Sequence, residues 1–81
     1  MRPQAPLVMV LSRVDAAASA DVRSEVRHLV EHAGVGDSAP AVALLATELV
    51  AGALERGARA LIVYADCDRR HVRVEVGDAF R

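Results

Sequence analysis

A nearly continuous apolar segment occupies the middle of the chain, between Ser38 and Gly57. Ser38 is a suitable N-cap, Pro40 is tolerated in a first helical turn, and Gly57 is a typical helix stop. The apolar side chains that cover most directions around the helix axis are Val42, Leu44, Leu45, Leu49, Val50, Ala53 and Leu54. Such a helix needs cover on several sides, so the sequence predicts a central buried helix on which the rest of the fold packs.

The flanking segments supply that cover. Residues 19–34 have an amphipathic helical pattern, with Ser19 as the predicted N-cap and Gly34 at the predicted C-terminus. The apolar run Pro6–Ser12 is typical of a buried strand or of an extended segment that leads into the fold. Residues 60–65 and 71–76 are predicted to form a hairpin across the polar turn 66–70.

These elements predict an α+β fold. We expect a two-layer sandwich with two main helices on one face of a small, largely antiparallel sheet, and a single domain over residues 1–81. The strict alternation around Val74 predicts that one sheet face meets water. Because a chain of 81 residues buries only about 60% of its unfolded surface, its stability is modest or shared with a partner.

Composition excludes several classes of function. All 10 basic residues are Arg, which with 11 acidic residues gives a net charge of −1, so we expect no nucleic-acid or anionic-membrane binding through a charged surface. The absence of lysine excludes phosphate-loop ATPases and Schiff-base enzymes. The single cysteine, Cys67, cannot form an internal disulfide, which predicts a cytoplasmic protein.

Neither apolar run is expected to enter a membrane. The run Leu7–Leu11 is shorter than the apolar core of a signal peptide, and Arg13 and Asp15 follow it. The run from Ala39 to Leu54 is interrupted by Glu48 and is shorter than the roughly 20 residues of a membrane span.

The predicted central helix also carries a polar stripe. Glu48, Gly52, Glu55 and Arg56 share one side at 100° per residue. A buried Glu48 would need solvent, a ligand or a cation as partner, and a glycine in mid-helix costs about 1 kcal/mol relative to alanine. The stripe therefore either lines a cavity or is the solvated side of the helix.

Three segments resemble a known family. Residues Thr47–Gly57 resemble the N box of the Bergerat-fold ATPases, which in the anti-sigma-factor serine kinases contains Glu-Leu-Val-x-Asn-Ala. Residues Val72–Ala79 resemble the strand that enters the first glycine box, and the helix Val22–Gly34 resembles the family's first helix. The chain is thus similar to the histidine-kinase-like ATPase domains, in a partial form.

The resemblance implies phosphoryl transfer from ATP to a regulatory protein, a sigma factor or its antagonist. It implies that Glu48 is the catalytic base and contacts the cofactor, and that Asp78 contacts adenine. Gly52 stands where the family has its Mg²⁺-binding Asn. Since Mg²⁺ requires oxygen ligands, both ATP and Mg²⁺ binding are put in doubt.

Two further departures from the family pattern also put nucleotide binding in doubt. Phe80 stands where the family has a small residue, and the second glycine box and lid do not follow Arg81. We therefore expect a truncated, degenerate ATPase-type domain that ends at the first glycine box, binds nucleotide weakly at most and is catalytically impaired.

Two alternatives stay open. The first is a non-catalytic interaction module, a homodimer or a partner of a regulator, because an unfinished sheet leaves edges and apolar surface that a second chain could cover. The second is a zinc-dependent hydrolase, because His28, Glu31 and His32 match the H-x-x-E-H pattern. These three side chains point away from the apolar stripe of their helix, which favours a solvated surface.

Overall fold

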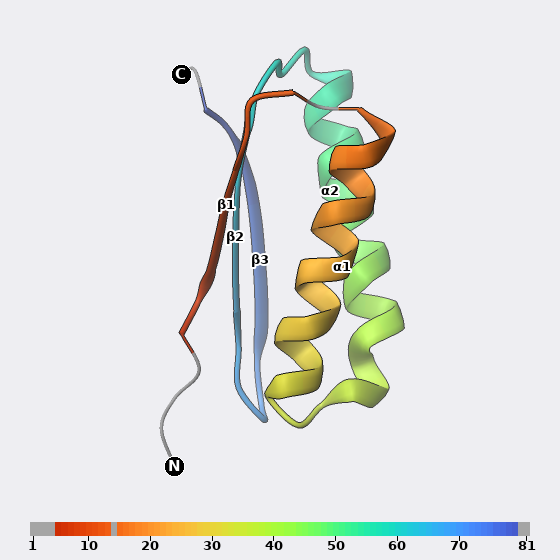
Figure 1. Ribbon diagram of the computed structural model, residues 1–81, viewed down its shortest axis with the longest axis vertical. Helices are drawn as coiled ribbons and strands as arrows, with labels where there is room; N and C mark the ends of the chain where they lie inside the picture. Colours follow the sequence, from red (N-terminus) through yellow and green to blue (C-terminus); the bar gives the residue numbers. More distant parts are fainter. Residues whose placement is uncertain (1–4, 14, 80–81) are drawn as a thin grey trace.

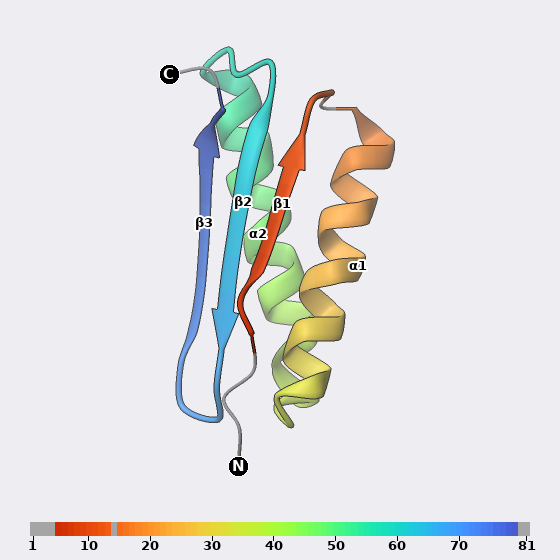
Figure 2. The ribbon, with the colours of Figure 1, turned by 60° about the vertical axis from the view of Figure 1, so that its left-hand side comes forward.

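The computed structural model describes residues 5–13 and 15–79 (Figure 1). Along the chain, its elements are β1 (Leu7–Leu11), α1 (Ala16–His32), the short 3₁₀ helix η1 (Gly36–Ser38), α2 (Ala39–Glu55), β2 (Leu61–Cys67) and β3 (Val72–Asp78). The three strands form one antiparallel sheet in the order β1-β2-β3. Both helices lie on the same face of this sheet, which confirms the predicted two-layer α+β sandwich (Figures 1 and 2).

The register of the strands gives the sheet one covered face and one open face. Val63 of β2 lies between Met9 of β1 and Val76 of β3, and all three face the helices. Its neighbour Ile62 pairs with Val10 on the open face. Side chains alternate between the two faces along each strand, so a single strand contributes to both environments.

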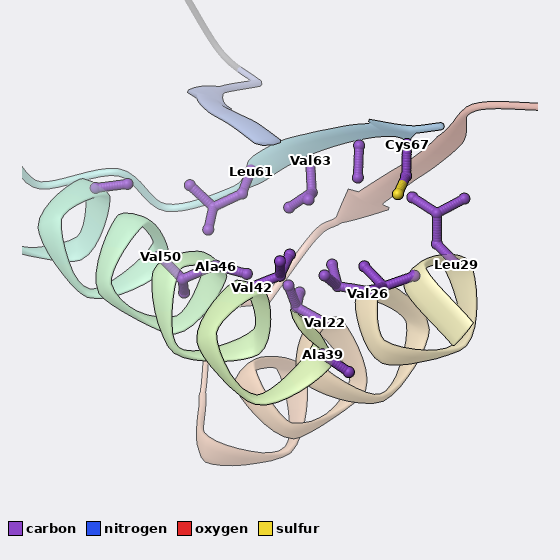
Figure 3. Close-up of a cluster of buried hydrophobic side chains, with 13 residues drawn as sticks. Val22, Val26, Leu29, Ala39, Val42, Ala46, Val50, Leu61, Val63 and Cys67 are labelled. Carbon is purple, nitrogen blue, oxygen red and sulfur yellow. The ribbon is translucent and has the colours of Figure 1, made fainter. Parts of the chain in front are cut away.

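The core lies between the helices and the covered face (Figure 3). It is built from aliphatic side chains and one thiol, as the scarcity of aromatic residues predicts. Its buried members are Val22, Val26, Leu29, Val30, Ala39, Val42, Ala46, Val50, Ala53, Leu61, Val63, Ala65 and Cys67. No polar or charged residue is buried within the described part of the chain. Apolar burial therefore accounts for the packing of the two layers.

Helix α1 begins earlier than predicted. Asp15, and not Ser19, is its N-cap, because the Asp15 carboxylate accepts a hydrogen bond of 2.9 Å from the backbone N–H of Ala18. The alanines that follow Asp15 are good helix formers, so the helix extends back to the first residue with a capping side chain. At the other end Gly34 has φ +82°, which confirms its predicted role as the helix stop.

Helix α2 is buried on one side only, which corrects the prediction of a helix buried nearly all round. Ala46 and Val50 are at most 1% exposed, whereas Leu44 is 61% exposed and Leu45 is 48% exposed. The sheet and α1 cover a single stripe of α2, and the apolar residues on the opposite stripe have no cover among the described residues. The reason is geometric, since two layers can contact only one side of an outer helix.

The segment Gly36–Glu55, which comprises η1 and α2, has 20 residues, and a stretch of 18 residues within it has a mean hydropathy of 1.3. It is long and apolar enough to cross a membrane by length and composition, contrary to the estimate from Ala39–Leu54 alone. The core helix of a water-soluble fold passes the same test. Because its buried stripe packs on the sheet, this segment is weak support for a membrane span.

The hairpin between β2 and β3 is tighter than predicted. Cys67 belongs to β2 and is 3% exposed, so it is a core residue and not a turn residue. Burial is the main cause that raises the pKa of the Cys67 thiol above its ordinary value. The negative charges of the nearby Asp68 and Asp66 raise this pKa further. The Asp68 carboxylate accepts hydrogen bonds from the backbone N–H groups of Arg70 (2.7 Å) and His71 (2.8 Å). These bonds close the turn and lower the pKa of Asp68.

Candidate functional site

A pocket of about 200 Å³ lies where the C-terminal end of α2 meets the end of β3. It is lined by Ala53, Arg56, Ala58 and Asp78. Ala53 and Arg56 belong to the segment that resembles the N box, and Asp78 belongs to the segment that resembles the strand of the first glycine box, whereas Ala58 directly follows the first of these segments. The fold therefore brings together two of the three segments that carry the resemblance.

The end of α2 is held by a glycine motif. Gly57 has φ +89°, a conformation that favours glycine. The N–H of Ala58 donates to the carbonyl of Ala53 (3.1 Å), and the N–H of Gly57 donates to that of Leu54 (2.9 Å). This pair of bonds is a Schellman motif, which satisfies the last carbonyls of a helix. It fixes Ala58 beside Ala53 and so forms one wall of the pocket.

The other wall depends on the register of β3. Asp78 is opposite Leu61, the first residue of β2, and the N–H of Ala79 donates to the carbonyl of Ala60 (3.0 Å). Because β2 begins directly after the turn at Gly57, this register places Asp78 at the same end of the molecule as Arg56. An acidic residue and a basic residue thus border one small cavity.

Gly52 and Glu48 lie on the exposed side of α2 before this pocket. A Cβ atom at Gly52 would lie 3.2 Å from Nη1 of Arg56, so Gly52 leaves room for the Arg56 side chain. Glu48 is exposed and lies two turns before Arg56, about 12 Å along the helix axis. The structure therefore places Gly52 beside the pocket, whereas Glu48 is not one of the residues that line it.

The sequence places Arg56 on the polar stripe but predicts no role for it, and no sequence pattern above singles out Ala53 or Ala58 as a site residue. The pocket-lining residues could have been found from Gly57, because a glycine stop predicts that the next residue folds back on the last turn of the helix. The separation of Glu48 from the pocket was also predictable, because a helix rises about 1.5 Å per residue and eight residues separate Glu48 from Arg56.

The residues present do not fit a bound Mg²⁺. Gly52 has no side-chain oxygen, and Mg²⁺ requires near-octahedral oxygen coordination. The described ranges 5–13 and 15–79 contain no group of three or more His, Cys, Asp or Glu residues that could hold a metal ion.

The pocket at the ends of α2 and β3 is small. Its volume is below the 300–1,000 Å³ typical of pockets that enclose a whole ligand of drug size. It has room for part of a nucleotide.

The histidines of α1 lie apart from this pocket. His28, Glu31 and His32 are all exposed, and Nδ1 of His32 lies 2.8 Å from the carbonyl oxygen of His28. The two rings meet edge to face, with centroids 6.5 Å apart. The three side chains do not converge as a metal-binding group in the part of the chain that the structure describes. The zinc hydrolase alternative therefore gains no support from the geometry.

Comparison of the chain with protein-family models, with curated proteins and with solved structures found no match. The resemblance to the Bergerat-fold ATPases consequently depends on the motifs in this sequence.

Proposed function

We propose that the chain is an ATP-binding-type domain similar to the anti-sigma-factor serine kinases, with a nucleotide site at the end of α2 and β3. The observation that carries the proposal is that Arg56 and Asp78, from two different motifs, line one pocket. A carboxylate accepts a hydrogen bond from the exocyclic amine of adenine, and a guanidinium pairs with phosphate oxygens. Asp78 is therefore the proposed adenine contact within the pocket, and the long side chain of Arg56 is proposed to contact the phosphates outside it.

Catalysis is impaired in this proposal. Phosphoryl transfer depends on metal ions that neutralise the charge developing on the phosphates. With Gly52 in place of a metal-binding Asn, Glu48 could orient a hydroxyl group of a protein substrate but would act without that metal. The protein would then bind a nucleotide and a regulatory partner, a sigma factor or its antagonist, in the cytoplasm.

Calorimetric titration with ATP and ADP tests this proposal, with and without Mg²⁺. We expect dissociation constants between about 10 µM and 1 mM, with little dependence on Mg²⁺. Asp78→Asn should weaken binding about tenfold, because an amide replaces the charged acceptor. The absence of heat with either nucleotide would contradict the proposal.

The role of Gly52 has its own test. Gly52→Asn restores the side-chain oxygen of the family motif, so ATP binding should become dependent on Mg²⁺. Gly36→Asn makes the same change in η1, away from the pocket, and should leave the profile unaltered. An unchanged profile in Gly52→Asn would show that residues 47–57 are not an N box.

A second candidate function is a non-catalytic interaction module. The open face of the sheet favours it, because Val8 is 60% exposed, Val10 is 69% exposed and Ile62 is 43% exposed. Adjacent apolar side chains on an uncovered sheet face are typical of an interaction surface. Light scattering across a concentration series tests this function, since it predicts a homodimer or a stable complex. A monomer at every concentration would contradict the homodimer.

A further inference from the structure

The strand β3 lies at an edge of the sheet. The order β1-β2-β3 leaves its outer side without a partner strand among residues 5–13 and 15–79. An edge strand of this kind presents a row of backbone N–H and C=O groups to which another strand can pair.

The hydrogen bonds at the two ends of β3 show which groups point outward. The N–H of Asp68 donates to the carbonyl of His71 (2.9 Å), and the N–H of Ala79 donates to that of Ala60 (3.0 Å). In an antiparallel pair, alternate residues bond to the same neighbouring strand. The odd-numbered residues of β3 therefore bond to β2. The outward backbone groups within the strand belong to even-numbered residues, among them Val72, Val74 and Val76.

The residues before and after Val74 carry opposite charges, and both charged side chains lie on the open face of the sheet. Arg73 and Glu75 are both exposed, and neither forms an ion pair within 4 Å with another described residue. On the β2 side, Arg73 lies opposite Asp66 and Glu75 lies opposite Tyr64. Their outer sides are therefore available to charges on a further strand.

We propose that a second copy of this chain pairs with the outer edge of β3, antiparallel, around a two-fold axis at Val74. In this register the backbone N–H and C=O groups of Val74 form hydrogen bonds with those of Val74 in the other copy. The backbone groups of Val72 do the same with those of Val76 in the other copy. Arg73 of each copy then lies opposite Glu75 of the other, in a non-hydrogen-bonded pair, where side chains come closest. The proposal rests on the second proposed function, interaction through the sheet, and specifies its partner and its register.

Charge selects this register over its neighbours. A shift of the two-fold axis to Arg73 places two arginines opposite each other, and a shift to Glu75 places two glutamates opposite each other. Like charges directly opposite are destabilising. Registers that pair odd with even residues would set outward groups of one strand against inward groups of the other, so their backbones could not bond.

The covered side of the same edge also fits a second copy. Val72 is 37% exposed, and Val74 and Val76 are half-buried at the margin of the core. Pairing about Val74 would place these valines against one another and continue the apolar layer across both copies. The edge of β1 offers less, because it has only Val8 and Val10 as outward residues by the same alternation, and no charge there sets a register.

Sedimentation equilibrium of the protein without nucleotide, from about 1 µM to 1 mM, tests the proposal. The protein should form a dimer, and Arg73→Glu or Glu75→Arg alone should weaken it at least about tenfold, because two attractions become repulsions. The double variant with both changes restores opposite charges and should regain the original affinity within about threefold. Arg27→Glu makes the same charge change on α1 and should have no effect.

Proline variants locate the backbone contact. Val74→Pro removes an outward N–H that β2 does not use, a position where an edge strand tolerates proline, and should abolish the dimer. Circular dichroism should show that this variant stays folded. A dimer that survives Val74→Pro and both single charge reversals would overturn this register while leaving the interaction function intact. Loss of the dimer only in Val10→Pro would assign the contact to β1. A monomer throughout would overturn both the register and the homodimer.

Discussion

The two sides of α2 differ in what they do for the protein. One side carries Ala46 and Val50, at most 1% exposed, which pack against the sheet and α1. The other side carries Leu44 and Leu45, which are 61% and 48% exposed, together with the exposed Glu48. Burial accounts for every residue on the first side, whereas the fold does not require those on the second.

This difference separates the residues that stabilise the fold from those that have a proposed function. An exposed leucine contributes little to folding, and a glycine within a helix reduces its stability. The second side nevertheless carries exposed leucines, Gly52 and Glu48. It ends near Arg56, which lines the pocket. The stability of α2 thus comes from its buried side, whereas Glu48, Gly52 and Arg56, to which we assign roles only by proposal, lie outside the buried stripe.

A charge placed on each side should give the largest contrast. Ala46→Asp buries a carboxylate without a partner and should destabilise the fold by at least about 3 kcal/mol, enough to unfold a small domain. Ala41→Asp makes the same change at an exposed position near the N-terminus of α2 and should alter stability by less than about 0.5 kcal/mol. Urea unfolding followed by circular dichroism measures both. Equal effects would show that the two sides are not distinct.

Shortening of aliphatic side chains should give a smaller contrast. Val50→Ala removes buried methyl groups and should cost about 2 kcal/mol. Leu45→Ala removes more atoms, but from a half-exposed side chain, and should cost less than about 0.5 kcal/mol. A cost above about 1.5 kcal/mol for Leu45→Ala, measured by urea unfolding, would mean that something covers this side of α2 in solution.

Replacement of the glycines should give the smallest effects, of opposite sign. Gly52→Ala should stabilise α2 by about 0.5–1 kcal/mol, because the terminal Nη1 atom of Arg56 can move away from the new methyl group. Gly57→Ala should destabilise by about 1 kcal/mol, because φ +89° is unfavourable for alanine. Thermal unfolding distinguishes them. A destabilised Gly52→Ala would mean that Gly52 has a packing role.

Much of this fold was predictable from local patterns. The alternation of Val72, Val74 and Val76 indicated a strand with two different faces, and Gly34 and Gly57 indicated the helix ends. The start of α1 was predicted wrongly, because Ser19 and Asp15 are both good N-caps and the alanines between them favour the longer helix.

The exposure of α2 was not predictable from its composition. Apolar periodicity shows which residues can be buried, but the number of layers that pack on a helix depends on the rest of the fold. Similarly, Glu48, Gly52 and Asp78 were chosen by motif, but their relation to a pocket depends on the register of β3 and on the turn at Gly57. These tertiary features join residues far apart in the sequence.

The most direct test of the nucleotide site is a backbone amide NMR titration with ATP, without added metal. Shifts confined to the residues around the pocket, Gly52, Arg56, Ala58 and Asp78, and strongly reduced in Asp78→Asn, are the predicted result. No shifts up to about 5 mM ATP, or shifts that map to α1 or to the open face of the sheet, would contradict a nucleotide site at the end of α2.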